Sequence, residues 1–132
     1  MRIRRRRDTT VDRLTAELLR EASAKGDWEH LFVSVTFDEG ATSASGFVYT
    51  GDGWDWSGVA KAGSQTLDLF RQVRGELDDP RGPCQGILYW LDRDRARVEI
   101  THHWGDEAEE WRIRPTNAQQ IRERARTVID DE

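Results

Sequence analysis

Residues 31–50 read LFVSVTFDEGATSASGFVYT, and this stretch decides the fold. Apolar side chains recur at every second position from Leu31 to Phe37, which is the period of a β-strand. The acidic and glycine residues at 38–40 predict a turn, and residues 44–50 predict a returning strand. The stretch therefore predicts an antiparallel hairpin with one face directed toward a core.

A second hairpin is predicted further along the chain. Residues 86–91 form an apolar run, residues 92–95 a polar turn, and residues 96–104 an alternating strand that returns. Residues 111–113 are a candidate for a short fifth strand. Because both hairpins are antiparallel, we expect a single antiparallel sheet.

Three further segments have the periodicity of amphipathic helices. The first can be capped by Thr9 or Thr10, the second by Ser64, and the third begins after residues 115–117. Their apolar positions are Val11, Leu14, Leu18 and Ala22; Leu67, Phe70, Val73 or Arg74, and Leu77; and Ala118, Ile121, Ala125 and Val128. We therefore predict an α+β fold, in which an antiparallel β-sheet of two hairpins is packed by three helices on one side.

The charge of the 132-residue chain is distributed unevenly. The net charge is -5, but five arginines lie within residues 1–7, and the remaining residues carry 15 basic and 25 acidic side chains, a net of -10. We expect residues 1–7 to form a basic flexible arm and residues 8–132 to form a single α+β domain. The arm is either a solvated tail or a contact for nucleic acid or membrane. The acidic body disfavours nucleic acid as the main partner, because it repels phosphate.

Other features of the composition limit the compartment and the chemistry. No apolar run approaches the roughly 20 residues that a membrane-spanning helix needs, so we expect no membrane partner. Cys84 is the only cysteine and cannot form an internal disulfide, which favours a reducing compartment or indifference to redox state. Cys84 also lacks the surrounding motif of a catalytic nucleophile.

The neighbouring His102 and His103 raise the question of a metal site. Adjacent residues in a strand point to opposite faces, so the two imidazoles cannot converge on one ion without distortion. His30 could supply another ligand, but the cysteine and histidine spacing of zinc sites is absent. We therefore expect no metal site, and with no nucleophile motif around Cys84 we expect no enzymatic activity.

Two clusters combine carboxylates with indole rings in predicted loops, where binding residues are common. The 52–56 cluster contains Asp52, Trp54, Asp55 and Trp56, and the 104–111 cluster contains Trp104, Asp106, Glu107, Glu109, Glu110 and Trp111. Such clusters suit a protein interface, because the rings supply desolvated area and the acids steer a basic partner. Alternatively, the indoles turn inward and cap the sheet edges. The sequence leaves both interpretations open.

Between Trp28 and Trp111 the chain contains SGFVY at residues 45–49, GW at 53–54, LDLFRQVR at 67–74, GILYW at 86–90 and VEI at 98–100. Through these segments it resembles the YezG-type immunity proteins of bacterial polymorphic toxin systems. The resemblance covers about 85 residues and consists of an order of elements with aromatic positions, without a catalytic signature. The resemblance implies a stoichiometric toxin inhibitor that needs no cofactor and works in the cytoplasm of the producing cell.

The main functional hypothesis is therefore an immunity protein that binds a cognate toxin with a basic surface through the two clusters. The alternative is a small nucleic-acid-associated or regulatory module that uses the arginine-rich arm. A third hypothesis is a small hydrolase that uses His102 or His103. The sequence does not determine the oligomeric state, nor which tryptophan side chains face outward.

We predict that residues 1–7 are dispensable for folding. Only Met1 and Ile3 in this arm are apolar, so the arm can bury little surface. A chain lacking residues 1–7 should keep nearly the same thermal midpoint in calorimetry. A fall of more than about 5 °C, which corresponds to roughly 1 kcal/mol in a domain of this size, would contradict this expectation.

Overall fold

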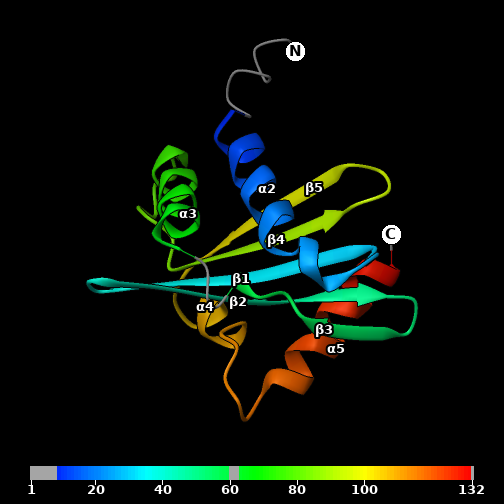
Figure 1. The fold of residues 1–132 in the computed structure, drawn as a ribbon. Coiled ribbons are helices and arrows are strands. Elements are labelled where there is room, and N and C mark those ends of the chain that lie inside the picture. Colours follow the sequence, from blue (N-terminus) through cyan, green and yellow to red (C-terminus); the bar gives the residue numbers. More distant parts are fainter. Residues whose placement is uncertain (1–8, 60–62, 132) are drawn as a thin grey trace.

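The computed structural model describes residues 9–59 and 63–131 (Figure 1). Its strands are β1 (His30–Asp38), β2 (Ala41–Thr50), β3 (Gly53–Trp56), β4 (Gly86–Asp92) and β5 (Arg97–His103). Its helices are α2 (Thr9–Glu21), the 3-10 turn η1 (Ser23–Lys25), α3 (Ser64–Glu76), α4 (Gly105–Glu110) and α5 (Ala118–Asp130). The fold is α+β, as predicted, and the arm predicted at residues 1–7 lies outside the described residues.

The five strands form one antiparallel sheet in the order β3-β2-β1-β4-β5. The two predicted hairpins are confirmed as β1–β2 and β4–β5, and they join along β1 and β4. Leu31, for example, is opposite Val48 of β2 on one side and Leu91 of β4 on the other. This arrangement places β1 at the centre of the sheet and leaves β3 and β5 as its edges.

Helices cover both faces of the sheet, whereas the sequence predicted helices on one side only (Figure 1). On one face, α2 and α3 pack on aliphatic side chains such as Val33 and Val35 of β1. On the other face, α5 packs on an aromatic layer that includes Phe32 of β1. Because β1 is central and covered on both faces, its seven residues from Leu31 to Phe37 are all buried, including the polar Ser34 and Thr36.

The fifth strand lies earlier in the chain than predicted. A two-residue turn at Gly51 and Asp52 brings Thr50 opposite Gly53, and Gly51 has a φ of 54°, which glycine adopts without strain. Residues 53–56 therefore pair with β2 as β3, where the sequence indicated a tight turn. Residues 111–113 do not form a strand: the Trp111 N–H donates to the Ala108 carbonyl and closes α4.

The connections around α4 and α5 also differ from the predicted loops. Residues 105–110 form the short helix α4, and its first turn carries Asp106 and Glu107, which are favourable near a helix N-terminus. Asn117 precedes α5, but its side chain makes no capping bond to the helix. Within the described residues, no helix combines the length and the apolar character needed to cross a bilayer.

The sheet contains one position where only glycine fits. A Cβ on Gly46 of β2 would lie 2.0 Å from the carbonyl oxygen of Phe32 in β1. Gly75 of α3 is a matched comparison, because a Cβ there meets nothing within 4 Å. Space therefore requires glycine at position 46 but not at position 75, although both residues lie inside regular elements.

We expect Gly46→Ala to destabilise the fold by more than about 2 kcal/mol, because the methyl group must push two central strands apart. Gly75→Ala should instead stabilise the protein by roughly 0.5–1 kcal/mol, since alanine has the higher helix propensity. Urea unfolding of both variants measures the two changes. Similar stability of Gly46→Ala and the unchanged protein would show that β1 and β2 are less closely paired than the structure indicates.

Candidate functional site

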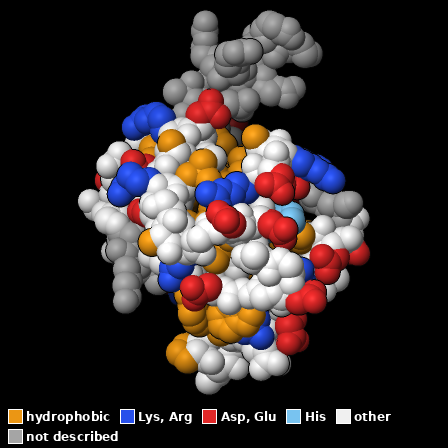
Figure 2. Space-filling view, turned by 45° about the vertical axis from the view of Figure 1, so that its right-hand side comes forward, with side chains coloured by type: hydrophobic (Ala, Val, Ile, Leu, Met, Phe, Trp, Pro, Cys, Tyr) orange, Lys and Arg blue, Asp and Glu red, His pale blue; other side chains and the backbone are white. Residues whose placement is uncertain are grey.

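The edge strand β3 presents two indole rings to solvent. Trp54 and Trp56 are 44% and 42% exposed, and they are the large hydrophobic side chains classed as exposed in the described part of the chain. Residues two apart in a strand share a face, so both rings lie on the α5 side of the sheet. Figure 2, in which the right-hand side of Figure 1 comes forward, shows hydrophobic side chains gathered low on the molecule, with charged groups beside them.

The two exposed rings are held in place by packing against each other and against the core. Their centroids are 6.0 Å apart in an edge-on arrangement. The ring of Phe47, which is fully buried, lies 4.9 Å from Trp56 and 5.7 Å from Trp54. Trp54 and Trp56 are therefore a supported pair rather than two mobile side chains, and we call them the indole pair.

Asp55 lies on the opposite face of β3 from the indole pair, because adjacent residues in a strand point to opposite faces. Its carboxylate lies 3.5 Å from the ammonium of Lys25, which follows α2 on the opposite side of the sheet. Its Oδ1 also accepts a hydrogen bond of 2.7 Å from the Trp56 backbone N–H. The second contact occupies a donor of an edge strand, a position that could otherwise pair with another chain.

A groove of about 490 Å³ runs beside the indole pair, between the β2–β3 turn and α5. It is lined by Tyr49, Asp52, Gly53, Trp54, Arg122, Glu123, Arg126 and Asp130. We call it the β3–α5 groove. Sequence reasoning found Asp52 and Trp54 but missed the α5 residues. The available signal was the pair of arginines at positions 122 and 126, which share the polar side of an amphipathic helix.

Arginines from α5 stack on the aromatic rings of the β3–α5 groove. The Arg122 guanidinium lies 4.1 Å from the centre of the Trp54 ring, and that of Arg126 lies 5.4 Å from the Tyr49 ring. The Tyr49 hydroxyl donates a hydrogen bond of 2.9 Å to the Arg122 carbonyl oxygen. Burial raises the pKa of Tyr49 above its usual value, because the charged phenolate is disfavoured away from water.

The 104–111 cluster is split between the two faces of the sheet. Trp111 is buried in the aromatic layer, with its ring 5.7 Å from that of Phe32, and its carbonyl accepts a 2.6 Å hydrogen bond from Ser34. Trp104 is partly buried against the α2 and α3 side, where its Nε1 donates to the Gly82 carbonyl. For these two indoles the structure supports the inward-facing alternative, and neither is a free surface anchor.

The acidic residues of α4 are exposed, but most of them bind groups of the same chain. Glu107 contacts His103 at 2.6 Å, and Glu110 contacts Arg124 at 3.6 Å. Glu109 accepts hydrogen bonds from Arg112 and Arg114. Asp106 is also exposed, and no ion pair joins it to another described residue.

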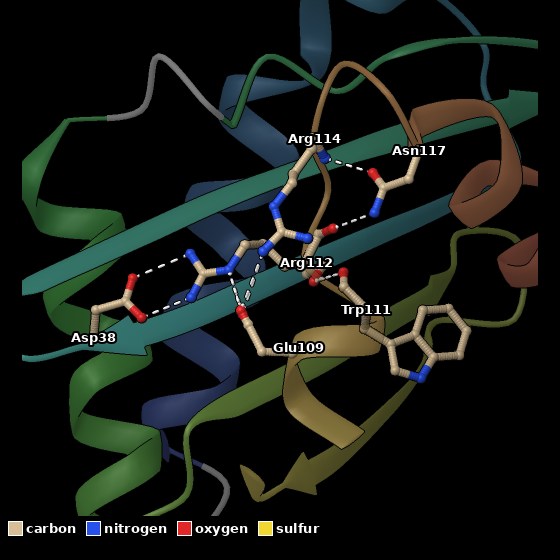
Figure 3. Close-up of polar contacts among 7 residues, drawn as sticks. Asp38, Glu109, Trp111, Arg112, Arg114 and Asn117 are labelled. Atoms are coloured by element: carbon tan, nitrogen blue, oxygen red, sulfur yellow. Dashed lines mark hydrogen bonds and ion pairs between the residues drawn. The ribbon is translucent and has the colours of Figure 1, made fainter. Parts of the chain in front are cut away.

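Arg112 connects α4 to the β1–β2 hairpin (Figure 3). Its guanidinium donates to the Asp38 carboxylate at 2.6 and 3.1 Å and to Glu109 at 2.8 Å. The hydrogen bonds from Arg112 lower the pKa of the Asp38 carboxyl below its usual value. Asn117 fixes the same loop, because its amide donates to the Arg112 carbonyl and its Oδ1 accepts the Arg114 N–H. Glu109 therefore has a structural task in holding this loop.

The histidines lie on opposite faces of β5 and have different surroundings. His103 contacts Thr101 at 2.7 Å as well as Glu107. Burial lowers the pKa of His102, and its Nε2 has no hydrogen-bond partner among the described residues. The thiol of Cys84 is buried, which raises its pKa. Across residues 9–59 and 63–131, no group of three or more His, Cys, Asp or Glu side chains is placed to hold a metal ion.

We predict that the buried and exposed tryptophans respond differently to truncation. Trp111→Ala should cost about 3–5 kcal/mol of unfolding free energy, because it opens a cavity in the aromatic layer. Trp56→Ala should cost less than about 2 kcal/mol, since its ring is already partly in water. Chemical denaturation of both variants distinguishes the two roles. Equal stability of the variants would show that Trp111 is not a core residue.

Comparison with known proteins does not supply a function for this chain. No protein-family model matches it, and no curated protein matches it at a significant level. The indole pair and the β3–α5 groove are therefore the features from which a function can be argued.

Proposed function

We propose that this protein is an immunity protein, which binds a cognate bacterial toxin and neutralises it by forming a stoichiometric complex. The observation that carries the proposal is the indole pair, which presents two large aromatic side chains to solvent on an edge strand. The resemblance to YezG-type immunity proteins supports the same function. A YezG-type immunity protein would work in the cytoplasm of the producing cell, and we propose the same location for this chain.

The indole pair has the properties of an interface anchor. Tryptophan is enriched among the residues that dominate binding energy, because burying its ring removes a large area from water. The contacts with Phe47 restrict the rings before a partner arrives. Less side-chain freedom is then lost on binding, which improves affinity.

The charge of the protein favours a basic partner. Residues 8–132 carry a net charge of -10, so a basic toxin surface is attracted at long range. Toxins that act on nucleic acid need such basic surfaces to bind phosphate. Asp52 is an exposed carboxylate in the lining of the β3–α5 groove, and Asp106 is an exposed carboxylate of α4. We assign both a role in steering.

The direct test is to capture the partner with wild-type protein and compare the indole variants. A gene for a large modular protein beside the gene for this chain would supply the candidate toxin. Trp54→Ala and Trp56→Ala should each weaken binding by at least about 30-fold, which corresponds to roughly 2 kcal/mol per anchor. Gln72→Ala, on the exposed face of α3, is the control and should bind normally. Calorimetry gives the affinity, and thermal melting confirms that each variant is folded.

The proposal also predicts which residues are not needed for inhibition of the toxin. His102→Ala and His103→Ala should leave protection of toxin-expressing cells intact, because inhibition needs no catalytic group. Asp106→Lys should slow association and reduce its salt dependence with little effect on dissociation. Loss of protection in a folded histidine variant, or unchanged affinity in a folded variant lacking both indoles, would refute the proposal.

A further inference from the structure

The β3–α5 groove has an aromatic wall and charged walls. Trp54 and Tyr49 supply the aromatic surface from β3 and β2, whereas α5 supplies charged side chains from the opposite side. Its volume of about 490 Å³ is within the range of about 300–1,000 Å³ that is common for binding sites of small molecules. It can therefore receive one long side chain from a partner whose surface rests on the neighbouring indole pair.

The two arginines of the groove are already engaged. Arg122 lies over Trp54 at 4.1 Å. Arg126 donates to the Gly51 carbonyl oxygen and lies 3.5 Å from the Asp130 carboxylate. The Arg126 guanidinium is therefore held by groups of the protein, and the Arg122 guanidinium covers part of the Trp54 ring.

Two carboxylates of the groove have no basic partner among the described residues. Asp52 lies exposed in the β2–β3 turn, on the opposite side of the groove from α5. Glu123 of α5 accepts a hydrogen bond of 3.1 Å from Gln119, which is neutral. The lining as a whole has three carboxylates against two guanidiniums. The charge of the groove therefore complements a cation.

From this charge and shape we infer that the β3–α5 groove binds an arginine side chain of the partner protein, between Asp52 and Glu123 and beside Trp54. Arginine fits better than lysine, because its planar guanidinium donates hydrogen bonds to two carboxylates at once. The inference rests on the proposed function only in taking the partner to be a protein. It adds that the partner presents an arginine side chain at the interface.

The test uses N-acetyl-arginine methylamide as the probe and the full-length chain as the receptor. Nuclear magnetic resonance of the tryptophan indole N–H groups reports binding at Trp54. The corresponding citrulline derivative has nearly the same shape without the charge, so it should bind at least fivefold more weakly. The lysine derivative should bind with intermediate affinity, and added salt should weaken the binding of both basic probes.

Variants of the two carboxylates locate the bound probe. Asp52→Asn with Glu123→Gln should reduce binding of the arginine probe to the level of the citrulline probe. Asp94→Asn, which changes an exposed carboxylate in the β4–β5 turn, is the control and should leave binding unchanged. All three changes keep the size of the side chain and lie on the surface, so the fold is retained.

Three results would overturn the inference. The first is equal binding of the arginine and citrulline probes, or binding of neither. The second is unchanged arginine binding in the Asp52→Asn, Glu123→Gln variant. The third is tighter binding of a thymidine oligonucleotide at Trp54, which would assign the groove to nucleic acid.

The same variant separates this inference from the proposed function. If the captured partner binds the Asp52→Asn, Glu123→Gln variant as tightly as the wild type, the arginine site is wrong while the immunity function stands. If the partner still requires the carboxylates and Trp54 but not Trp56, the groove is confirmed and the anchor role of Trp56 is wrong.

Discussion

Burial of β1 on both of its faces is the constraint on which the rest of the structure depends. Phe32 and Val33 are consecutive, point to opposite sides of the sheet and are both fully buried. Each face of the sheet therefore needs its own layer of helices. Leaving either face in water would expose a large apolar area, and each Å² of that area costs about 25 cal/mol of folding free energy. The pair α2 and α3 supplies one cover, and the segment from α4 to α5 supplies the other.

The second cover also creates the candidate site. Ile121 and Ala125 of α5 enter the aromatic layer, and their helical neighbours at the next position, Arg122 and Arg126, are then carried to its rim. There the guanidiniums meet the rings of Trp54 and Tyr49 and form one wall of the β3–α5 groove. The groove is thus a consequence of how α5 packs, and the loop held by Arg112 and Asn117 sets where α5 begins.

The sequence predicted the parts of this fold that depend on local pattern. Alternation identified both hairpins, and periodicity identified the three long helices. It did not predict the second helical cover, because Ser34 and Thr36 resemble residues of a solvated strand face. The structure accommodates them differently: the Ser34 hydroxyl donates to the Trp111 carbonyl, so a polar group is buried without losing its hydrogen bond.

The two acidic and aromatic clusters show why composition alone could not identify the site. Trp54 and Trp56 are separated by one residue in an edge strand, so they share a face and remain together in solvent. Trp104 and Trp111 are separated by α4, and this helix carries the chain past the strand ends from one face to the other, so Trp111 is buried on one face and Trp104 is half-buried on the other. Predicting this difference requires the position of α4, which depends on packing rather than on the residues between the two indoles.

The acidic side chains also divide into two groups, those that contact basic groups of the same chain and those that do not. All carboxylates contribute to the long-range field of the protein, whether or not a cation lies beside them. At short range, however, Glu107, Glu109 and Glu110 already contact basic groups of the same chain, and a partner would have to displace those groups. Asp52 and Glu123 require no such exchange. We therefore expect a basic partner to be recognised at contact distance in the β3–α5 groove, although α4 has the denser run of acidic residues.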